Sequence, residues 1–424
     1  MSEEATRTMP DETAMAHTLP IVPDLTDPRT FVPEPPHEVW AALRRREEPH
    51  FQDREGAPGF HSVTRYAHVD AVLRDSATYS SEWGMTLDTA LGERDAAAGR
   101  MIELTDPPRH QRLRRLVSGG LTRSAARAMD GVLRGYVDRW VEEAVRAGET
   151  DFVRAVAARV PGAATGLMLG LPEREWQPLS AHAGRAVCGS LAADDPGAAD
   201  LTARRRSTAT ANGQLLTHLA GLVDDEAGLA EGGLIRRLLD ADVDGDRLTQ
   251  EEVLLNCLNL AIGGNETTKN ATAAGVAAFA RHPEQWQWLR AHPEHLDRAV
   301  EEILRHTTPP LHLVRTVTRP TRLGGTPLEP GELVCLWLPS ANRDEEVFAD
   351  ADDFRVDRAD NPHLAFTSGR HFCMGAALAR TQMRLVFGGL LARVERIHQV
   401  GAPARRASNF VAAYDSLPVA LVPE

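Results

Sequence analysis

The longest helical pattern in the sequence begins at about Gln250 and ends at the His282–Pro283 pair. Proline disfavours helical geometry in the residue before it, so the helix is expected to stop there. At the other end, Thr249 and Glu252 have the spacing of a capping box, in which each side chain bonds to the backbone of the other. The sequence therefore predicts one long helix, and any fold for this chain has to accommodate it.

The middle of this predicted helix is unusual for an otherwise apolar segment that is expected at the centre of the fold. Gly263 and Gly264 are adjacent, and each costs about 1 kcal/mol relative to alanine inside a helix. The polar residues NETT follow directly at 265–268. A helix that is locally weakened and carries polar groups at one point indicates that something occupies the space beside it.

Helical periodicity dominates the rest of the chain, and strand patterns are few. Apolar residues recur at helical spacing in 37–46, 65–75, 125–148 and 377–394. Short strand patterns with Gly and Pro turns occur at 59–65, 321–338 and 417–422. We therefore expect a mainly α fold with a small β portion.

Composition narrows the class of protein. The net charge of −13 disfavours a nucleic-acid partner, and no apolar run is long enough to suggest a membrane span. Four separated cysteines without a CxxC pair disfavour a disulfide scaffold or zinc ribbon, and with no signal peptide pattern they favour the cytoplasm. Within the 424 residues we expect a flexible N-terminal tail at 1–20 and a single domain at 21–424.

The segment DADVDGDRLTQE at 240–251 fits the pattern of a calcium-binding loop. No second copy exists, although such loops usually occur in pairs, and Arg247 stands at the position that is usually apolar. A polar turn followed by the capping box of the long helix explains the segment better. A calcium-regulated protein is kept as an alternative.

The stretch FTSGRHFCMG at 366–375 sets one cysteine just before a predicted helix. Cys373 has three interpretations: a core thiol, a nucleophile or a metal ligand. Amides and the positive dipole at a helix N-terminus stabilise a thiolate, so an easily deprotonated cysteine is expected. Gly369 and Gly375 would let the backbone approach a flat ligand closely.

Five motifs in order resemble those of the haem-thiolate monooxygenases, the cytochromes P450, of the soluble bacterial kind. They are LTDPPRHQRLRRLVS at 104–118, GGNETT at 263–268, EEILR at 301–305, DDFRVDR at 352–358 and FTSGRHFCMG at 366–375. The resemblance implies the cytochrome P450 fold, with a long central helix over haem b, and it covers nearly the whole chain after the tail.

The resemblance also implies roles at the haem. Cys373 would be the proximal iron ligand, Phe366 would pack beside the sulfur, and Gly369 and Gly375 would allow the turn beneath the haem. Thr367 stands where the family usually has glycine. The haem propionates would be bound by His110, Arg114, Arg315 and His371. A buried structural triad of charges would consist of Glu302, Arg305 and Arg358.

On the oxygen side, the resemblance makes Gly263 and Gly264 the residues that leave space for dioxygen. Glu266 and Thr267 match the family's acid–alcohol pair, which delivers protons during oxygen activation. The implied electron donors are a ferredoxin and its reductase, bound at a basic patch. The arginines of that patch would be Arg109, Arg112, Arg115, Arg370 and Arg380.

The substrate would meet a largely apolar pocket. By resemblance its lining is Trp83, Met85, Leu87, Ile262, Leu311, His312, Leu313, Val411 and Ala412. The expected reaction is hydroxylation of a small molecule, free or carried by a carrier protein, as a tailoring step in bacterial secondary metabolism. Oxidative coupling on an aromatic peptide or indole metabolite is the first alternative. A non-catalytic haem-thiolate sensor and a peroxide-driven peroxygenase are more distant ones.

Overall fold

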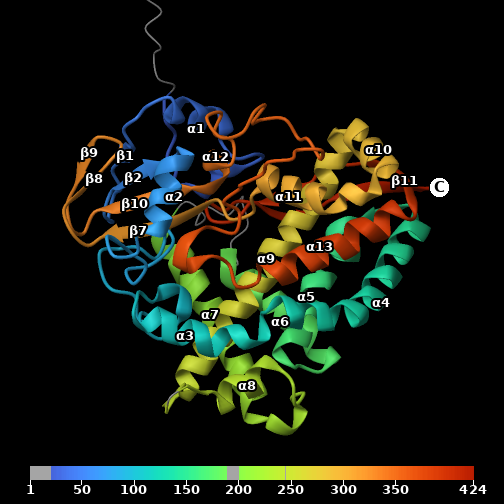
Figure 1. Cartoon of the computed structure of the whole chain (residues 1–424), viewed down its shortest axis with the longest axis horizontal. Helices are drawn as coiled ribbons and strands as arrows, with labels where there is room; N and C mark the ends of the chain where they lie inside the picture. Colours follow the sequence, from blue (N-terminus) through green and yellow to red (C-terminus); the bar gives the residue numbers. More distant parts are fainter. Residues whose placement is uncertain (1–20, 189–199, 244) are drawn as a thin grey trace, which may run out of the picture.

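The computed structural model describes residues 21–188, 200–243 and 245–424 (Figure 1), so the predicted tail at 1–20 lies outside the described residues. The helices are α1 (His37–Arg44), α2 (Tyr66–Arg74), α3 (Arg109–Val117), α4 (Arg123–Ala147), α5 (Arg159–Leu169), α6 (Glu173–Cys188), α7 (Leu201–Asp224), α8 (Leu234–Asp240), α9 (Gln250–Arg281), α10 (Pro283–Ala291), α11 (Leu296–Thr307), α12 (Leu338–Ala341) and α13 (Ala376–Leu391).

The strands are short. They are β1 (His50–Gln52), β2 (Phe60–Val63), β3 (Tyr79–Ser80), β4 (Glu149–Asp151), β5 (Asp242–Val243), β6 (Asp246–Arg247), β7 (His312–Val317), β8 (Thr321–Leu323), β9 (Thr326–Leu328), β10 (Leu333–Trp337), β11 (Val394–Gln399), β12 (Ala404–Arg406), β13 (Ala413–Ser416) and β14 (Pro418–Pro423). The prediction of a mainly α fold with a small β portion is confirmed.

Both predicted ends of the long helix are confirmed in α9. The Thr249 hydroxyl accepts the backbone N–H of Glu252, and the Glu252 carboxylate accepts the backbone N–H of Thr249 at 2.9 Å. His282 is the C-cap residue, directly before Pro283. The helix passes through Gly263 and Gly264 without a break, because the neighbouring elements that pack on it hold its geometry.

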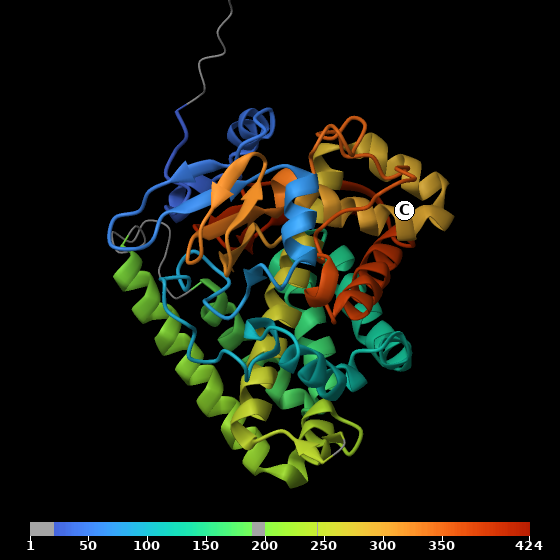
Figure 2. The same cartoon turned by 60° about the vertical axis from the view of Figure 1, so that its left-hand side comes forward.

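The largest sheet has the strand order β1-β2-β10-β7-β3 and lies to one side of α9 (Figure 1). Its β2–β10 pair is parallel and its other pairs are antiparallel. A second sheet, β11-β14-β4, lies at the opposite side, and α7 runs along the outer edge of the molecule (Figure 2).

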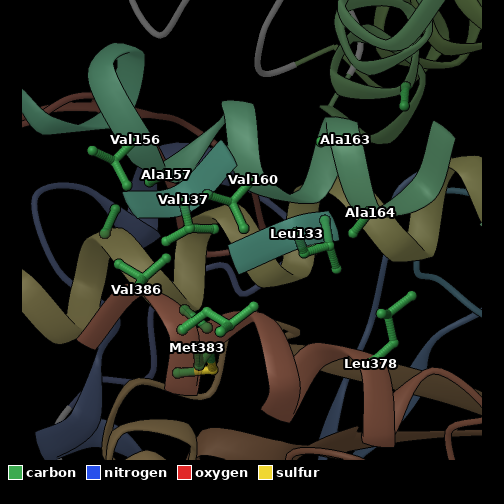
Figure 3. Packing of buried hydrophobic residues seen from close by; sticks show 14 of the residues in the cluster. Leu133, Val137, Val156, Ala157, Val160, Ala163, Ala164, Leu378, Met383 and Val386 are labelled. Carbon is green, nitrogen blue, oxygen red and sulfur yellow. The ribbon is translucent and has the colours of Figure 1, made fainter. Parts of the chain in front are cut away.

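The main apolar core surrounds α9 on the helical side of the molecule. Helices α4, α5 and α13 pack on one another there, which leaves α9 between this layer and the sheet. Figure 3 shows part of this core, with the labelled side chains Leu133, Val137, Val156, Ala157, Val160, Ala163, Ala164, Leu378, Met383 and Val386. Since α9 and α13 are both anchored in this core, the loop that precedes α13 has a fixed position beneath α9.

The segment 240–251 forms a small hairpin in its described part, and the capping box of α9 follows. Asp242 accepts hydrogen bonds from the backbone N–H of Gly245 at 2.8 Å and from the Arg247 guanidinium at 3.0 Å. These bonds support a polar turn. No group of three or more metal-binding side chains occurs among the described residues.

Within the described ranges, no helix has both the length and the apolar character to cross a membrane. Cys257, Cys335 and Cys373 are free thiols.

Candidate functional site

A cavity of about 970 Å³ lies between the middle of α9 and the loop that leads into α13. On the α9 side it is lined by Gly263, Gly264 and Thr267, and on the loop side by Phe366 and Cys373. The structure therefore brings together the two sequence features that stood out separately, the weakened helix and the cysteine motif.

Cys373 faces this cavity, whereas Cys257 and Cys335 are buried in the apolar clusters. Burial raises the pKa of the Cys373 thiol, although the backbone N–H groups of Gly375 and Ala376 and the positive Arg114 and Arg380 act in the opposite direction. The prediction of an easily deprotonated thiol is therefore wrong for the polypeptide by itself.

A raised pKa disfavours the interpretation of Cys373 as a nucleophile, because the thiolate is the reactive form. A bound metal cation deprotonates a thiol outright, so the same environment is compatible with a metal ligand.

The loop before Cys373 contains two residues in the left-handed region of backbone space. Gly369 has φ +68°, and a Cβ there would lie 2.5 Å from the carbonyl oxygen of Leu73 on α2. The tight turn is as predicted, but the close approach at Gly369 is to α2 and not to a flat ligand. Thr367, the departure from the family pattern, has φ +62°, and its hydroxyl donates to the carbonyl of His371 at 3.0 Å.

Gly375 differs from Gly369, because its φ of −79° is open to any residue. A Cβ there would lie 3.8 Å from the Cys373 sulfur. Gly375 also lines the cavity, so a side chain at this position would occupy space beside the sulfur.

The polar groups at this end of the cavity fit the carboxylates of a haem. Both ring nitrogens of His110 and Nε2 of His371 are buried and have no hydrogen-bond partner in the described part of the chain, and the two ring centres are 4.4 Å apart. Burial lowers the pKa of His110 to about 4 and that of His371 to about 2, so both are neutral donors near pH 7. Buried donors without a partner indicate a missing acceptor.

Two arginines line the cavity together with these histidines. Arg315 is 5% exposed, lines the cavity and donates to the Val314 carbonyl, but it forms no ion pair with a described residue. Burial lowers its pKa to about 10, so it stays charged. Arg114 also lines the cavity and donates to the carbonyls of Arg370 and Phe372. The predicted propionate partners therefore lie together.

The two glycines of α9 have different surroundings. A Cβ at Gly263 would meet nothing within 4 Å, so this position is open to the cavity. A Cβ at Gly264 would lie 2.8 Å from the Thr165 hydroxyl of α5. Gly263 thus leaves space as predicted, while Gly264 chiefly allows α5 to pack closely against α9. One turn after Gly263, Thr267 also lines the cavity, and its hydroxyl donates to the Gly263 carbonyl at 2.7 Å.

Glu266 lies elsewhere than the acid–alcohol prediction implied. Its carboxylate is buried, accepts two hydrogen bonds from Lys269, and approaches α6, where a Cβ on Gly184 would be 2.9 Å away. It is not among the described residues that line the cavity. Consecutive helical residues point about 100° apart, so Thr267 and Glu266 face different neighbours.

The three residues of the predicted structural triad are in contact. Glu302 is fully buried and forms ion pairs with Arg305 at 2.8 Å and with Arg358 at 3.1 Å. Arg305 also donates to the carbonyls of Asn342 and Ala351. These bonds tie α11 to the segment before the cysteine loop, away from the cavity.

Of the residues predicted for the pocket, Met85, Ile262, Leu313 and Val411 line the cavity. Five do not: Trp83, Leu87, Leu311, His312 and Ala412. His312 is a satisfied core residue, because it bonds to the Leu87 N–H at 3.0 Å and the Asn409 carbonyl at 2.7 Å. Leu87, Leu311 and Ala412 pack in the same apolar cluster behind the sheet.

The predicted basic patch is also smaller than expected. Arg109 pairs with Glu252 of α9, and Arg380 pairs with Glu301 while its guanidinium lies 4.5 Å from the centre of the Phe366 ring. The exposed members are Arg112, Arg115 and Arg370.

Glu103 and Asn259 are two polar residues among the cavity residues that were not predicted from the sequence. Glu103 stands just before the DPP motif, and Asn259 lies one helical turn before Gly263. The available signal was the spacing of Asn256, Asn259, Gly263 and Thr267, which share one face of the helix.

Comparison with known proteins agrees with this geometry. The cytochrome P450 family model matches residues 231–403. The chain is 36% identical over 398 residues to a putative cytochrome P450 126 of Mycobacterium tuberculosis, covering 91% of this chain and 94% of that protein. It is 30% identical over 410 residues to linalool 8-monooxygenase of Pseudomonas putida, covering 95% and 99%.

The crystal structure of P450 OxyD, described as involved in the biosynthesis of vancomycin-type antibiotics, superposes with a TM-score of 0.82 at 32% identity. The match covers 95% of this chain and all of that chain. This chain therefore belongs to the cytochrome P450 family of monooxygenases, which are oxidoreductases that use haem b.

Proposed function

We propose that this cytochrome P450 hydroxylates a largely apolar small molecule as a tailoring step in bacterial secondary metabolism. The observation that carries the proposal is the cavity itself, bounded by Cys373 on one side and by Gly263 and Thr267 on the other. Its wall is mostly apolar, with Met85, Leu313 and other such side chains, which favours an apolar ligand. Relatives are named for linalool, for steroids and for antibiotic biosynthesis.

In this proposal the residues of the cavity hold the haem and direct protons. Bound haem b supplies the iron at which dioxygen is reduced so that one oxygen atom can be inserted into a C–H bond. The thiolate of Cys373 would bind that iron. The neutral rings of His110 and His371 would donate hydrogen bonds to the propionates, while Arg114 and Arg315 would supply positive charge.

Thr267 is the residue that we assign to proton delivery at the oxygen side. Its Oγ1 donates to the Gly263 carbonyl, so its lone pairs remain available to accept a hydrogen bond from the water that carries the proton. Glu266 would pass protons to Thr267. Its carboxylate would first have to break its hydrogen bonds with Lys269, because both carboxylate oxygens accept from that ammonium.

We further propose that a ferredoxin, supplied by its reductase, delivers electrons beside Cys373. The adjacent Phe372 is 41% exposed, and Arg112, Arg115 and Arg370 are exposed around this end of the haem site. Such a rim suits an acidic donor. A cytoplasmic location and a single domain at 21–424 are kept as proposals that rest on the sequence.

The experiment is a titration of the purified holoenzyme with terpenes, steroids, macrolides, cyclic dipeptides and indoles, followed by turnover with ferredoxin and reductase. A low-to-high-spin shift, and a product that has gained one oxygen atom, would support hydroxylation. A product that has lost two hydrogens would indicate oxidative coupling instead. Binding without turnover of any bound compound would contradict the enzymatic proposal. A shift seen only with carrier-bound compounds would identify a carrier-bound substrate.

A further inference from the structure

A carboxyl group lies in the wall of the otherwise largely apolar cavity. Glu103 belongs to the short 3₁₀ helix Ile102–Leu104 and lines the cavity opposite Asn259 of α9. With its NH₂ group turned toward the carboxylate, the Asn259 amide nitrogen lies 2.7 Å from Oε2 and 3.2 Å from Oε1. Among the described residues, Glu103 has no ion-pair partner.

The backbone on both sides of Glu103 is tied to the same helix. Asn256, one turn before Asn259, accepts the backbone N–H of Ile102 at 3.0 Å and donates to the carbonyl of Arg100 at 2.9 Å. The Thr105 hydroxyl closes the turn by donating to the Met101 carbonyl. The carboxyl is therefore held in place before any ligand arrives, which lowers the cost of binding one.

The surroundings favour a positive ligand. Neighbouring lining residues are apolar, including Met101, Leu104, Leu258 and Ile262. Burial raises the pKa of Glu103 to about 7, because the positive charge of Arg315 offsets the burial only in part and Asp95 adds negative charge. A carboxylate in such a place gains most from a counter-charge.

We propose that Glu103, oriented by Asn259, binds a positively charged amino group of the substrate, so that this enzyme selects apolar molecules that carry a basic nitrogen. The inference rests on the proposed function only in taking the cavity as the substrate site.

The helix fixes the spacing between Asn259 and Thr267, the residue assigned to proton delivery. Asn259 and Thr267 share one face of α9 and are eight residues apart, which corresponds to about 12 Å along the axis. The contact for the amino group and the proton-delivery residue are therefore about two helical turns apart on the cavity wall.

Other charged or titratable groups on the cavity wall are Asp88, Asp95, His110, Arg114, Arg204, Arg205, Arg206, Arg315, His371 and Cys373. Asp88 is paired with Arg204, and Asp95 accepts the backbone N–H of Ala97. The low pKa values of His110 and His371 keep both rings neutral between pH 6 and 8. Glu103 is therefore the carboxyl group that a cation would contact in the apolar part of the cavity, beside Leu258 and Ile262.

The test uses two probes of the same shape and the holoenzyme. One is a phenylalkyl trimethylammonium ion, which is charged at every pH and has no lone pair to bind iron. The other is its neutral carbon isostere, in which a tert-butyl group replaces the ammonium. Calorimetry at pH 8 should show the cation binding about tenfold more tightly than the isostere. The preference should fall as the pH drops through about 7, because Glu103 becomes protonated.

Glu103→Gln keeps the shape and the contact with Asn259 but removes the charge, so it should abolish the preference. Asp95→Asn is the matched control, since it removes another carboxylate from the same wall and should keep the preference. Equal loss in both variants, or no preference in the wild-type protein, would overturn the proposal. If Glu103→Gln does not fold, the pH dependence of the wild-type protein decides. Absence of haem would instead count against the proposed function.

Discussion

Lys269 Nζ lies 2.6 Å from Oε2 and 2.8 Å from Oε1 of Glu266, and both side chains are buried on α9. Lys269 is the only lysine in the chain. This lysine neutralises a buried carboxylate of the central helix.

Replacing Lys269 with methionine should destabilise the protein by about 3–5 kcal/mol, because it leaves the Glu266 carboxylate buried without its partner. Urea unfolding of the holoprotein measures this. The control is Arg146→Met, which breaks an exposed pair with Glu142 and should cost less than about 0.5 kcal/mol. Similar small losses of stability in both variants would show that the buried pair contributes no more to the free energy of unfolding than the exposed pair.

Thr267→Ala should retain haem but release hydrogen peroxide in place of much of the product, with coupling reduced about tenfold or more, because the hydroxyl that passes protons is gone. Product and peroxide formed per reduced ferredoxin are the measurement. Thr267→Ser should restore coupling. Thr272→Ala is a matched control, since its hydroxyl makes the same bond to the preceding turn but does not line the cavity. Unchanged coupling in Thr267→Ala would refute the role.

The Thr367→Gly variant should be more stable than the Thr367→Ala variant by about 1 kcal/mol. Both variants lose the hydroxyl bond to His371, but only alanine keeps a Cβ at the left-handed φ of +62°. Thermal unfolding of Thr367→Gly and Thr367→Ala makes the comparison. Equal or greater stability of the alanine variant would show that the loop adjusts and that no backbone strain is stored there.

Glu103→Gln should stabilise the ligand-free protein at pH 8 by up to about 3 kcal/mol and have much less effect at pH 4. The folded pKa of about 7 lies above the ordinary value of 4.5, so the wild-type protein loses stability as the pH rises between these values. Above pH 7 the folded state carries the cost of the ionised carboxylate at the cavity wall. Unfolding free energies at several pH values test this, and a variant effect that does not depend on pH would contradict it.

Local signals predicted the parts of the fold that local chemistry determines. The capping box at Thr249 and the proline after His282 set the ends of α9, and the cysteine motif placed Cys373 before α13. The residues of the cavity wall were predicted less well, because they depend on which side chains of each strand face the cavity. In β7, Leu313 and Arg315 line the cavity, whereas His312 faces the core behind the sheet.

The same limit explains the remaining differences. All six residues of β7 are buried, so no polar alternation in the sequence distinguishes its two faces. Val411 lines the cavity while the next residue, Ala412, packs behind it. The role of Glu103 could not be predicted from its neighbours in sequence, because it depends on the contact with Asn259. That residue is distant in sequence, and α9 brings it beside Glu103.

The most direct test of the account is the absorption spectrum of the reduced protein with carbon monoxide, compared between wild-type, Cys373→Ala and Cys257→Ala proteins. We predict a thiolate-type haem spectrum for the wild-type protein and for Cys257→Ala, whose thiol is buried in the apolar core. Cys373→Ala should lack that spectrum. A protein without haem, or a thiolate spectrum that survives the loss of Cys373, would contradict the assignment of this cysteine as the iron ligand.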